Sequence, residues 1–125
     1  MQGTRLPDNE WLSRAADGEI ESGDYGRCLI KHPQKAGTAT ETVYGESWEW
    51  FVCCPDGSTT KLWVNEDDRN GHRHYITEHE DGSITVGGSV MGGDVVPAVA
   101  LFGRGPEGSG PLWHGHLDHG VWRSC

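Results

Sequence analysis

Histidines are the side chains of this sequence with the clearest potential for chemistry. Four of the seven form two pairs with H-x-H spacing, His72 with His74 and His114 with His116. On a β-strand, residues two positions apart point to the same face, so each pair can present two imidazoles to one metal ion. The spacing therefore predicts a metal site; the alternative is that these are solvated or hydrogen-bonding histidines near strand ends.

Cysteine is a second potential metal ligand, and the chain contains Cys28, Cys53, Cys54 and Cys125. The first residues of the chain form neither a basic nor an apolar region of the kind found in a signal peptide. We therefore expect a reducing compartment, in which thiols stay free or bind metal. Cys53 and Cys54 are adjacent, so on a strand they point to opposite faces, and we expect at most one of them to do chemistry.

The segment "GHRHYITEHEDG" resembles the first motif of the cupins, in which H-x-H followed three or four residues later by Glu supplies ligands for iron, manganese or zinc. His72, His74 and Glu78 match that spacing. The glycine that follows comes too early, and the second cupin motif has no clean equivalent before His114. The resemblance implies a metal-dependent enzyme, which stays as the alternative to a protein without catalytic activity.

Other catalytic signatures are missing from the sequence. It contains no Gly-x-Ser-x-Gly elbow, P-loop or dinucleotide fingerprint, and the segment "GRGPEGSG" lacks the lysine that phosphate binding requires. A Cys54 nucleophile beside a histidine is the remaining catalytic option, but buried strand cysteines are usually inert. We therefore expect a protein that works by binding.

The charge of the chain limits its partners. Its formal net charge is −9, and its ten Lys and Arg residues are scattered, so we expect no nucleic-acid binding, which depends on clustered basic residues. No apolar run approaches the ~20 residues needed to span a bilayer, so we expect no membrane association. An acidic surface suits a basic protein partner, with attraction that weakens as salt screens it.

The N-terminal part predicts one short helix. Asp8 is a suitable N-cap for the segment "NEWLSRAA", and Gly18 is a suitable stop. The spacing of Trp11, Leu12 and Ala15 predicts the buried face of this helix.

The rest of the chain predicts strands joined by tight turns. Residues 27–32 predict a strand that is closed by Pro33, and the polar residues 33–47 predict a loop. Turn signals such as Asp81-Gly82 separate the later strands into hairpins. The predicted strands span 47–54, 59–65, 72–79, 84–90, 111–117 and 121–125, and 95–102 is either a strand or another buried segment.

These elements predict a mainly β protein: a single antiparallel sheet folded into a small sandwich or barrel built from hairpins, with a short N-terminal helix. We expect one domain over residues 1–125, with a helical or irregular lead at 1–26 and a β-hairpin core at 27–125. Tryptophans supply much of the core volume. Those on predicted strands are Trp48, Trp50, Trp63, Trp113 and Trp122.

From residue 51 to residue 122 the chain resembles a family of small domains of unknown function found mostly in bacteriophages and mobile elements. These domains carry an aromatic residue with a Cys-Pro step, a "T-x-x-P-S-I"-like strand and a closing hairpin with a Cys/Trp-His-Gly/Ser step. The matching segments are Cys54-Pro55, residues 84–90, Trp113-His114-Gly115 and Gly120-Val121-Trp122. The resemblance implies an accessory or virion-associated protein, in the host cytoplasm or the virion, with a viral or host protein partner.

Many of these relatives carry a second cysteine just after the Cys-Pro step, which forms a zinc knuckle. Here Asp56 and Gly57 follow instead, so a complete Cys-rich knuckle is absent. If a metal is kept, the resemblance implies Cys54 with His114 as ligands, joined by His116 or by a histidine of the pair His72 and His74. Zinc accepts such a mixed Cys/His set.

Overall fold

The fold is given by a computed structural model that describes residues 1–35, 42–64, 71, 73–92 and 113–125. This part of the chain is mainly β, with one short helix near the N-terminus, as predicted. In chain order the elements are β1 (Thr4–Arg5), α1 (Trp11–Ala16), β2 (Asp24–Lys35), β3 (Thr42–Cys53), β4 (Thr59–Leu62), β5 (Tyr75–Glu78), β6 (Ile84–Gly87), β7 (Val90–Gly92), β8 (Trp113–Asp118) and β9 (Val121–Ser124).

Within the described ranges the strands form three sheets, where the sequence predicted one. The orders are β1-β2-β3-β4, β5-β6 and β7-β8-β9, and the pairing of β1 with β2 is parallel while the others are antiparallel. Gly88, between β6 and β7, has φ +94°, a conformation that glycine adopts readily. The chain can therefore turn out of the β5–β6 sheet there and start a new sheet at β7.

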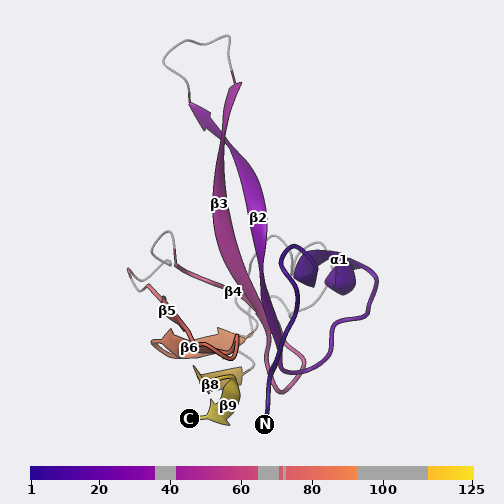
Figure 1. Ribbon diagram of the computed structural model, residues 1–125, viewed down its shortest axis with the longest axis vertical. Helices are drawn as coiled ribbons and strands as arrows, with labels where there is room; N and C mark the ends of the chain where they lie inside the picture. Colours follow the sequence, from indigo (N-terminus) through magenta and orange to yellow (C-terminus); the bar gives the residue numbers. More distant parts are fainter. Residues whose placement is uncertain (36–41, 65–70, 72, 93–112) are drawn as a thin grey trace.

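The four-stranded sheet separates two hydrophobic cores. Figure 1 shows α1 on one side of this sheet and β5 and β6 on the other. Successive residues of β3 point to opposite sides, so Trp50 and Val52 enter one core and Phe51 enters the other. Cys53 and Cys54 also lie in different cores, as their adjacency predicted. The larger core contains Tyr25, Trp50, Val52, Cys54, Leu62, Ile84, Val86, Val90, Leu117 and Trp122. The smaller core contains Leu6, Trp11, Cys28, Phe51 and Cys53.

Helix α1 covers the smaller core. Trp11 is buried, and Leu12 and Ala15 pack beside it, so the predicted buried face is confirmed. The helix ends as predicted near Gly18, which has φ +73°; the N–H of the next residue reaches back to the Arg14 carbonyl at 2.8 Å. These two features define a glycine-terminated helix end.

The predicted N-cap at Asp8 is wrong. Glu10 occupies the N-cap position and makes no side-chain cap hydrogen bond. The carboxylate of Asp8 instead accepts two hydrogen bonds from Arg27 on β2. A bidentate, charge-assisted hydrogen bond to a guanidinium is stronger than a hydrogen bond to one backbone N–H. The Asp8 carboxylate therefore binds Arg27 and does not cap the helix.

The start of β2 joins the two cores. The indole of Trp11 donates to the Asp24 carbonyl at 3.2 Å, and the indole of Trp122 donates to the Gly23 carbonyl at 3.0 Å. The N-terminal residues lie against the same region: the Gly3 N–H donates to the Gly120 carbonyl at 2.7 Å. Residues 1–26, predicted as a helical or irregular lead, therefore include β1 and the start of β2, and they are also bonded to the last hairpin.

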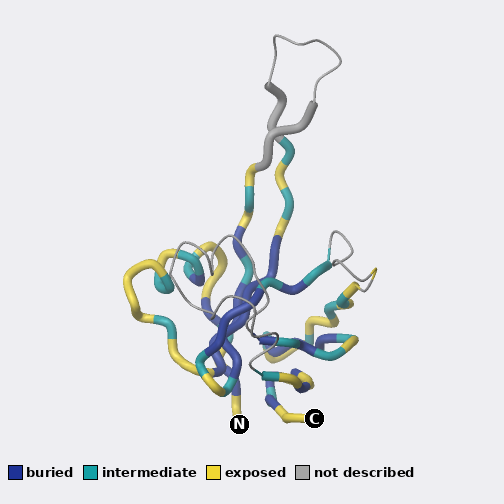
Figure 2. Tube along the Cα trace, turned by 180° about the vertical axis from the view of Figure 1, so that it is seen from behind, coloured by how far each residue is buried: buried dark blue, intermediate teal, exposed yellow. Residues whose placement is uncertain are grey.

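Strands β2 and β3 continue beyond the rest of the molecule as a two-stranded ribbon, which we call the arm (Figure 1). The loop predicted for residues 33–47 is therefore wrong, except for 36–41, which lie outside the described residues. The arm begins at the pair Leu29 and Trp48 and extends to Lys35 opposite Thr42. In Figure 2 the strands change from buried at the base to intermediate and exposed along the arm.

Pro33 does not end β2, because a backbone N–H at this position would not take part in the pairing with β3. Backbone groups of odd-numbered β2 residues face away from β3: Asn9 donates its N–H to the Arg27 carbonyl and accepts from the Leu29 N–H through its side chain. Pro33 is also odd-numbered, so its backbone nitrogen faces the outer edge of β2. The lack of an N–H there removes no hydrogen bond to β3. With Lys31 beside it, the proline also discourages pairing with another strand.

The three predicted hairpins after residue 47 are confirmed as β3–β4, β5–β6 and β8–β9. The first two close with the same Asp-Gly-Ser turn: the carboxylates of Asp56 and Asp81 each accept from the N–H of the serine two residues later, both at 2.9 Å. The segment 95–102 lies outside the described residues. No described helix is long and apolar enough to cross a membrane.

Candidate functional site

His74 has both ring nitrogens engaged within the fold. The Trp63 N–H donates to Nδ1 at 2.9 Å, and Nε2 lies 2.9 Å from the Ser89 carbonyl oxygen. A carbonyl only accepts, so Nε2 is the donor and Nδ1 the acceptor. His74 therefore bridges the end of β4 and the connection between β6 and β7, and neither nitrogen is free for a metal ion.

Cys54 is buried in the larger core. Burial, together with the charge of the nearby Asp56 carboxylate, raises the pKa of its thiol to about 12. A thiol with this pKa stays protonated at neutral pH, and the thiolate is the form that binds metal or attacks a substrate. In this arrangement Cys54 is a core residue.

His114 and His116 share one face of β8, as the H-x-H spacing predicted, and both are exposed. The inward face of β8 carries Gly115 and Leu117, both buried. Gly92, which pairs with Trp113, lies against Cys54, so the thiol faces the inward side of the β7–β8–β9 sheet. His114 and Cys54 thus lie on opposite sides of the sheet, and the predicted pair is not brought together.

The remaining predicted ligands do not complete a metal site among the described residues. Glu78, the third residue of the cupin-like motif, pairs with Arg5 at 3.2 Å and with Arg27 at 3.7 Å. His72 lies outside the described residues. Elsewhere in the described part of the chain, no three His, Cys, Asp or Glu side chains are grouped closely enough to hold a metal ion.

Two histidines next to hairpin turns meet across the sheets. The rings of His79 and His119 stack with centroids 3.5 Å apart and planes 7° apart. The Thr85 hydroxyl lies between their hairpins: it donates to Asp118 at 3.1 Å, accepts from the His119 N–H at 3.0 Å and lies 2.7 Å from His79 Nε2. Its single proton goes to Asp118, so His79 Nε2 is the donor. The network connects β5–β6 to β8–β9.

Trp48 and Leu29 form an exposed apolar pair at the base of the arm. They are direct cross-strand partners, so their side chains lie on one face, and their exposed fractions are 37% and 38%. The sequence placed Trp48 in the core with Trp50; the two do share a face, but only Trp50 is buried. Trp is one of the residues enriched at the energetic centre of protein interfaces.

Arg27 positions Trp48. Its guanidinium carbon lies 4.5 Å from the centre of the Trp48 ring, and its Nε and one terminal nitrogen each donate to Asp8 at 3.0 Å. One step nearer the body, Arg5 lies over Trp50 in the same way, 5.1 Å from the ring centre. The two stacked pairs form a continuous Arg/Trp row that leads from the core to the arm.

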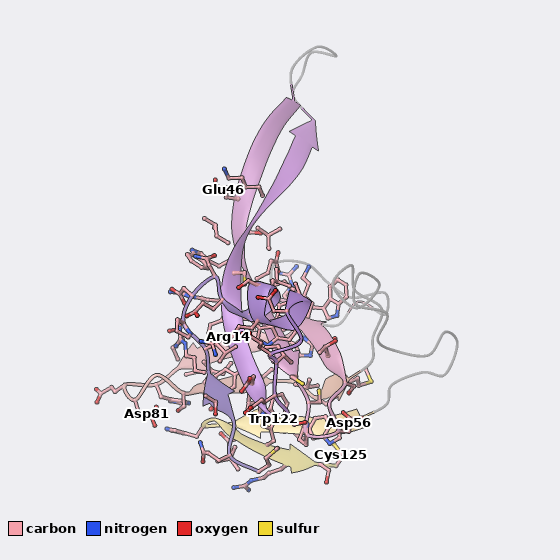
Figure 3. All side chains as sticks on the ribbon, turned by 90° about the vertical axis from the view of Figure 1, so that its right-hand side faces the viewer. Arg14, Glu46, Asp56, Asp81, Trp122 and Cys125 are labelled. Carbon is pink, nitrogen blue, oxygen red and sulfur yellow. The ribbon has the colours of Figure 1, made fainter. Side chains whose placement is uncertain are left out.

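Basic side chains along this row and the arm are paired with carboxylates. The hydrogen bonds from Arg27, followed by its charge and that of Arg5, hold the pKa of Asp8 below its usual value, and the same bonds raise the pKa of Arg27. Further along the arm, Lys31 lies opposite Glu46 with an N···O distance of 3.7 Å. Figure 3 shows Glu46 on the arm, far from the other labelled residues.

The arm is also the neutral part of the chain. Residues 29–48, which span both strands of the arm and the segment between them, contain two Lys or Arg and two Asp or Glu, so the net charge of −9 belongs to the rest of the sequence. The sequence alone could have supplied this count. The stacking of Arg27 on Trp48 could not be found from spacing, because it depends on the pairing register of two strands separated by the polar segment.

Searches with the whole sequence and structure found no matching family model, curated protein or solved structure.

Proposed function

We propose that this chain is a non-catalytic binding protein that engages a protein partner through the arm. The observation that carries the proposal is the exposed Trp48–Leu29 pair, held on a projecting ribbon by the stacked Arg27. Trp and Arg are enriched among the residues that dominate binding energy in protein interfaces. A side chain already fixed in place loses less entropy on binding than a mobile one.

The physics of a two-stranded ribbon also supports a partner at the arm. Isolated two-stranded hairpins are marginally stable in water, and a further packed layer stabilises them. The base of the arm packs on the smaller core through Ile30, whereas Trp48 and Leu29 are exposed on its other face. A partner seated on that face would add a packed layer to the ribbon.

The charge distribution suggests the chemistry of this partner. An apolar pocket that accepts Trp48, rimmed by basic residues, would meet the neutral arm and the acidic body at the same time. The partial resemblance to phage domains supports placing the protein among accessory or virion-associated proteins, with a viral or host partner. No second function is proposed, since His74 and Glu78 are engaged within the fold.

A comparison of matched surface variants tests the proposal. Trp48→Ser and Leu29→Ser remove the exposed pair, and Tyr75→Ser removes a side chain that is 70% exposed on β5, away from the arm. Each protein is immobilised and exposed to extract from the cells that produce it, at low and at high salt. We expect one protein that wild type and Tyr75→Ser retain, that both arm variants lose, and that high salt releases. Equal retention by all four proteins would contradict the proposal.

A further inference from the structure

The β8–β9 hairpin places Cys125 opposite His114. The last pair of the two strands is Gly115 opposite Ser124. At the next position the Cys125 N–H donates to the His114 carbonyl at 3.0 Å, so these two residues are also opposite each other. Directly opposite residues of antiparallel strands carry their side chains on the same face, with Cβ atoms about 4.5–5.5 Å apart. The hairpin therefore brings together a thiol and an imidazole that are distant in the sequence.

The face that they share is the outward face of the β7–β8–β9 sheet. His116 lies two residues from His114 and so points to that face as well. All three side chains are exposed, whereas Leu117 and Trp122 point inward and are buried. Figure 3 shows Cys125 at the end of β9. One thiol and two imidazoles thus occupy a small patch that solvent and ions can reach.

We propose that His114, His116 and Cys125 form a binding site for one zinc-like divalent metal ion. Two imidazoles and one thiolate are a ligand set that zinc accepts, and three protein ligands leave a fourth position for water or another molecule. On binding, the Cys125 thiol gives its proton to solvent, and the sulfur donates an electron pair to the metal. This site keeps the predicted pair His114 and His116 and replaces the buried Cys54 with an exposed cysteine.

The three donors do not converge on one point, since no three potential ligands are grouped in the described part of the chain. Binding therefore requires the side chains of His114, His116 and Cys125 to change rotamer. Exposed side chains change rotamer readily, and the strands that carry them are already hydrogen-bonded in register. The entropy lost by fixing three side chains is small beside the free energy of binding at structural zinc sites.

Cobalt(II) titration of the reduced, full-length protein tests the site. Wild type should bind one Co²⁺ per chain, with an absorption band from thiolate-to-cobalt charge transfer, and Zn²⁺ should displace the cobalt. Cys125→Ser should abolish the band, and His114→Ala and His116→Ala should each weaken binding by roughly tenfold or more. Because all three positions are exposed, these variants should keep the wild-type melting temperature.

The matched control is His119→Asn on the turn of the same hairpin. His119 has φ +50°, a conformation that asparagine also tolerates, and it is not part of the patch. This variant should bind cobalt as wild type does. The proposal is overturned if wild type gives no band, if the band survives in Cys125→Ser, if Cys54→Ala removes it, or if one metal is bound per two chains. Weak binding that is equal in all variants is adventitious and also overturns it.

Discussion

Arg27 stacks on Trp48 while both oxygens of the Asp8 carboxylate hold its guanidinium from another side. The arrangement joins three parts of the sequence: the segment before α1, the middle of β2 and the base of the arm. A planar guanidinium can stack on a ring and donate two parallel hydrogen bonds at once, which an ammonium cannot do. The relationship therefore predicts that arginine is required at position 27.

Arg27→Lys should lower the free energy of unfolding by about 0.5–1 kcal/mol, the range for a partly exposed charged pair. Urea denaturation at neutral pH measures this loss. In an Asp8→Asn background the same substitution should cost less, because one partner of the bond has already gone. An equal loss in the two backgrounds would show that Arg27 does not act through Asp8.

The pH dependence of this contribution follows from the lowered pKa of Asp8. A carboxylate with a depressed pKa in the folded state stabilises the protein above its usual pKa of 3.8, and the contribution is lost as pH falls through the lower folded value. The difference between wild type and Arg27→Lys should therefore be constant from pH 7 to about pH 5 and shrink below about pH 4.

Asp24→Asn should leave the protein as stable at neutral pH or raise its stability by less than about 1 kcal/mol. Burial raises the pKa of Asp24, so the charged form costs stability at pH values above that raised pKa and the cost disappears in acid. Asparagine keeps an oxygen that can accept from the Glu21 N–H, which lies 3.0 Å from the carboxylate. A melting temperature at pH 7 well below that of wild type would contradict this account.

The four cysteines should differ sharply in reactivity. Cys28, Cys53 and Cys54 are buried, and Cys125 is exposed. Under native conditions a maleimide reagent should label Cys125 within minutes and leave the other three unmodified until the protein is unfolded. Mass spectrometry of digested protein identifies the labelled residue. Early labelling of Cys54 would show that the larger core opens more readily than its packing implies.

Trp50→Ala and Trp48→Ala should have unequal effects although both residues lie on one face of β3. Trp50 is 5% exposed, so its truncation should cost about 3–5 kcal/mol and leave little folded protein. Trp48 is 37% exposed, and its truncation should cost about 1–2 kcal/mol. Circular dichroism with urea measures both. Equal losses would mean that the base of the arm is packed as tightly as the core.

Local patterns were sufficient to predict much of this fold. Alternating side chains and glycine-containing turns correctly identified three hairpins, and the spacing of Trp11, Leu12 and Ala15 correctly identified the buried face of the helix. The opposite positions of Cys53 and Cys54 follow from strand geometry alone. The register of the last hairpin could also have been predicted, since the two-residue turn at His119 and Gly120 places Cys125 opposite His114.

Tertiary structure decided where these side chains meet other elements. The sequence could not show that Pro33 sits on an edge, that Asp8 bonds to Arg27 and not to the helix, or that His74 bridges the end of β4 and the connection between β6 and β7. Backbone geometry fixes the direction of a side chain from its immediate neighbours, so it can be inferred locally. Burial and partner choice depend on which distant surfaces pack together, so only the folded chain determined that Cys54 lies in a core and Trp48 at the surface.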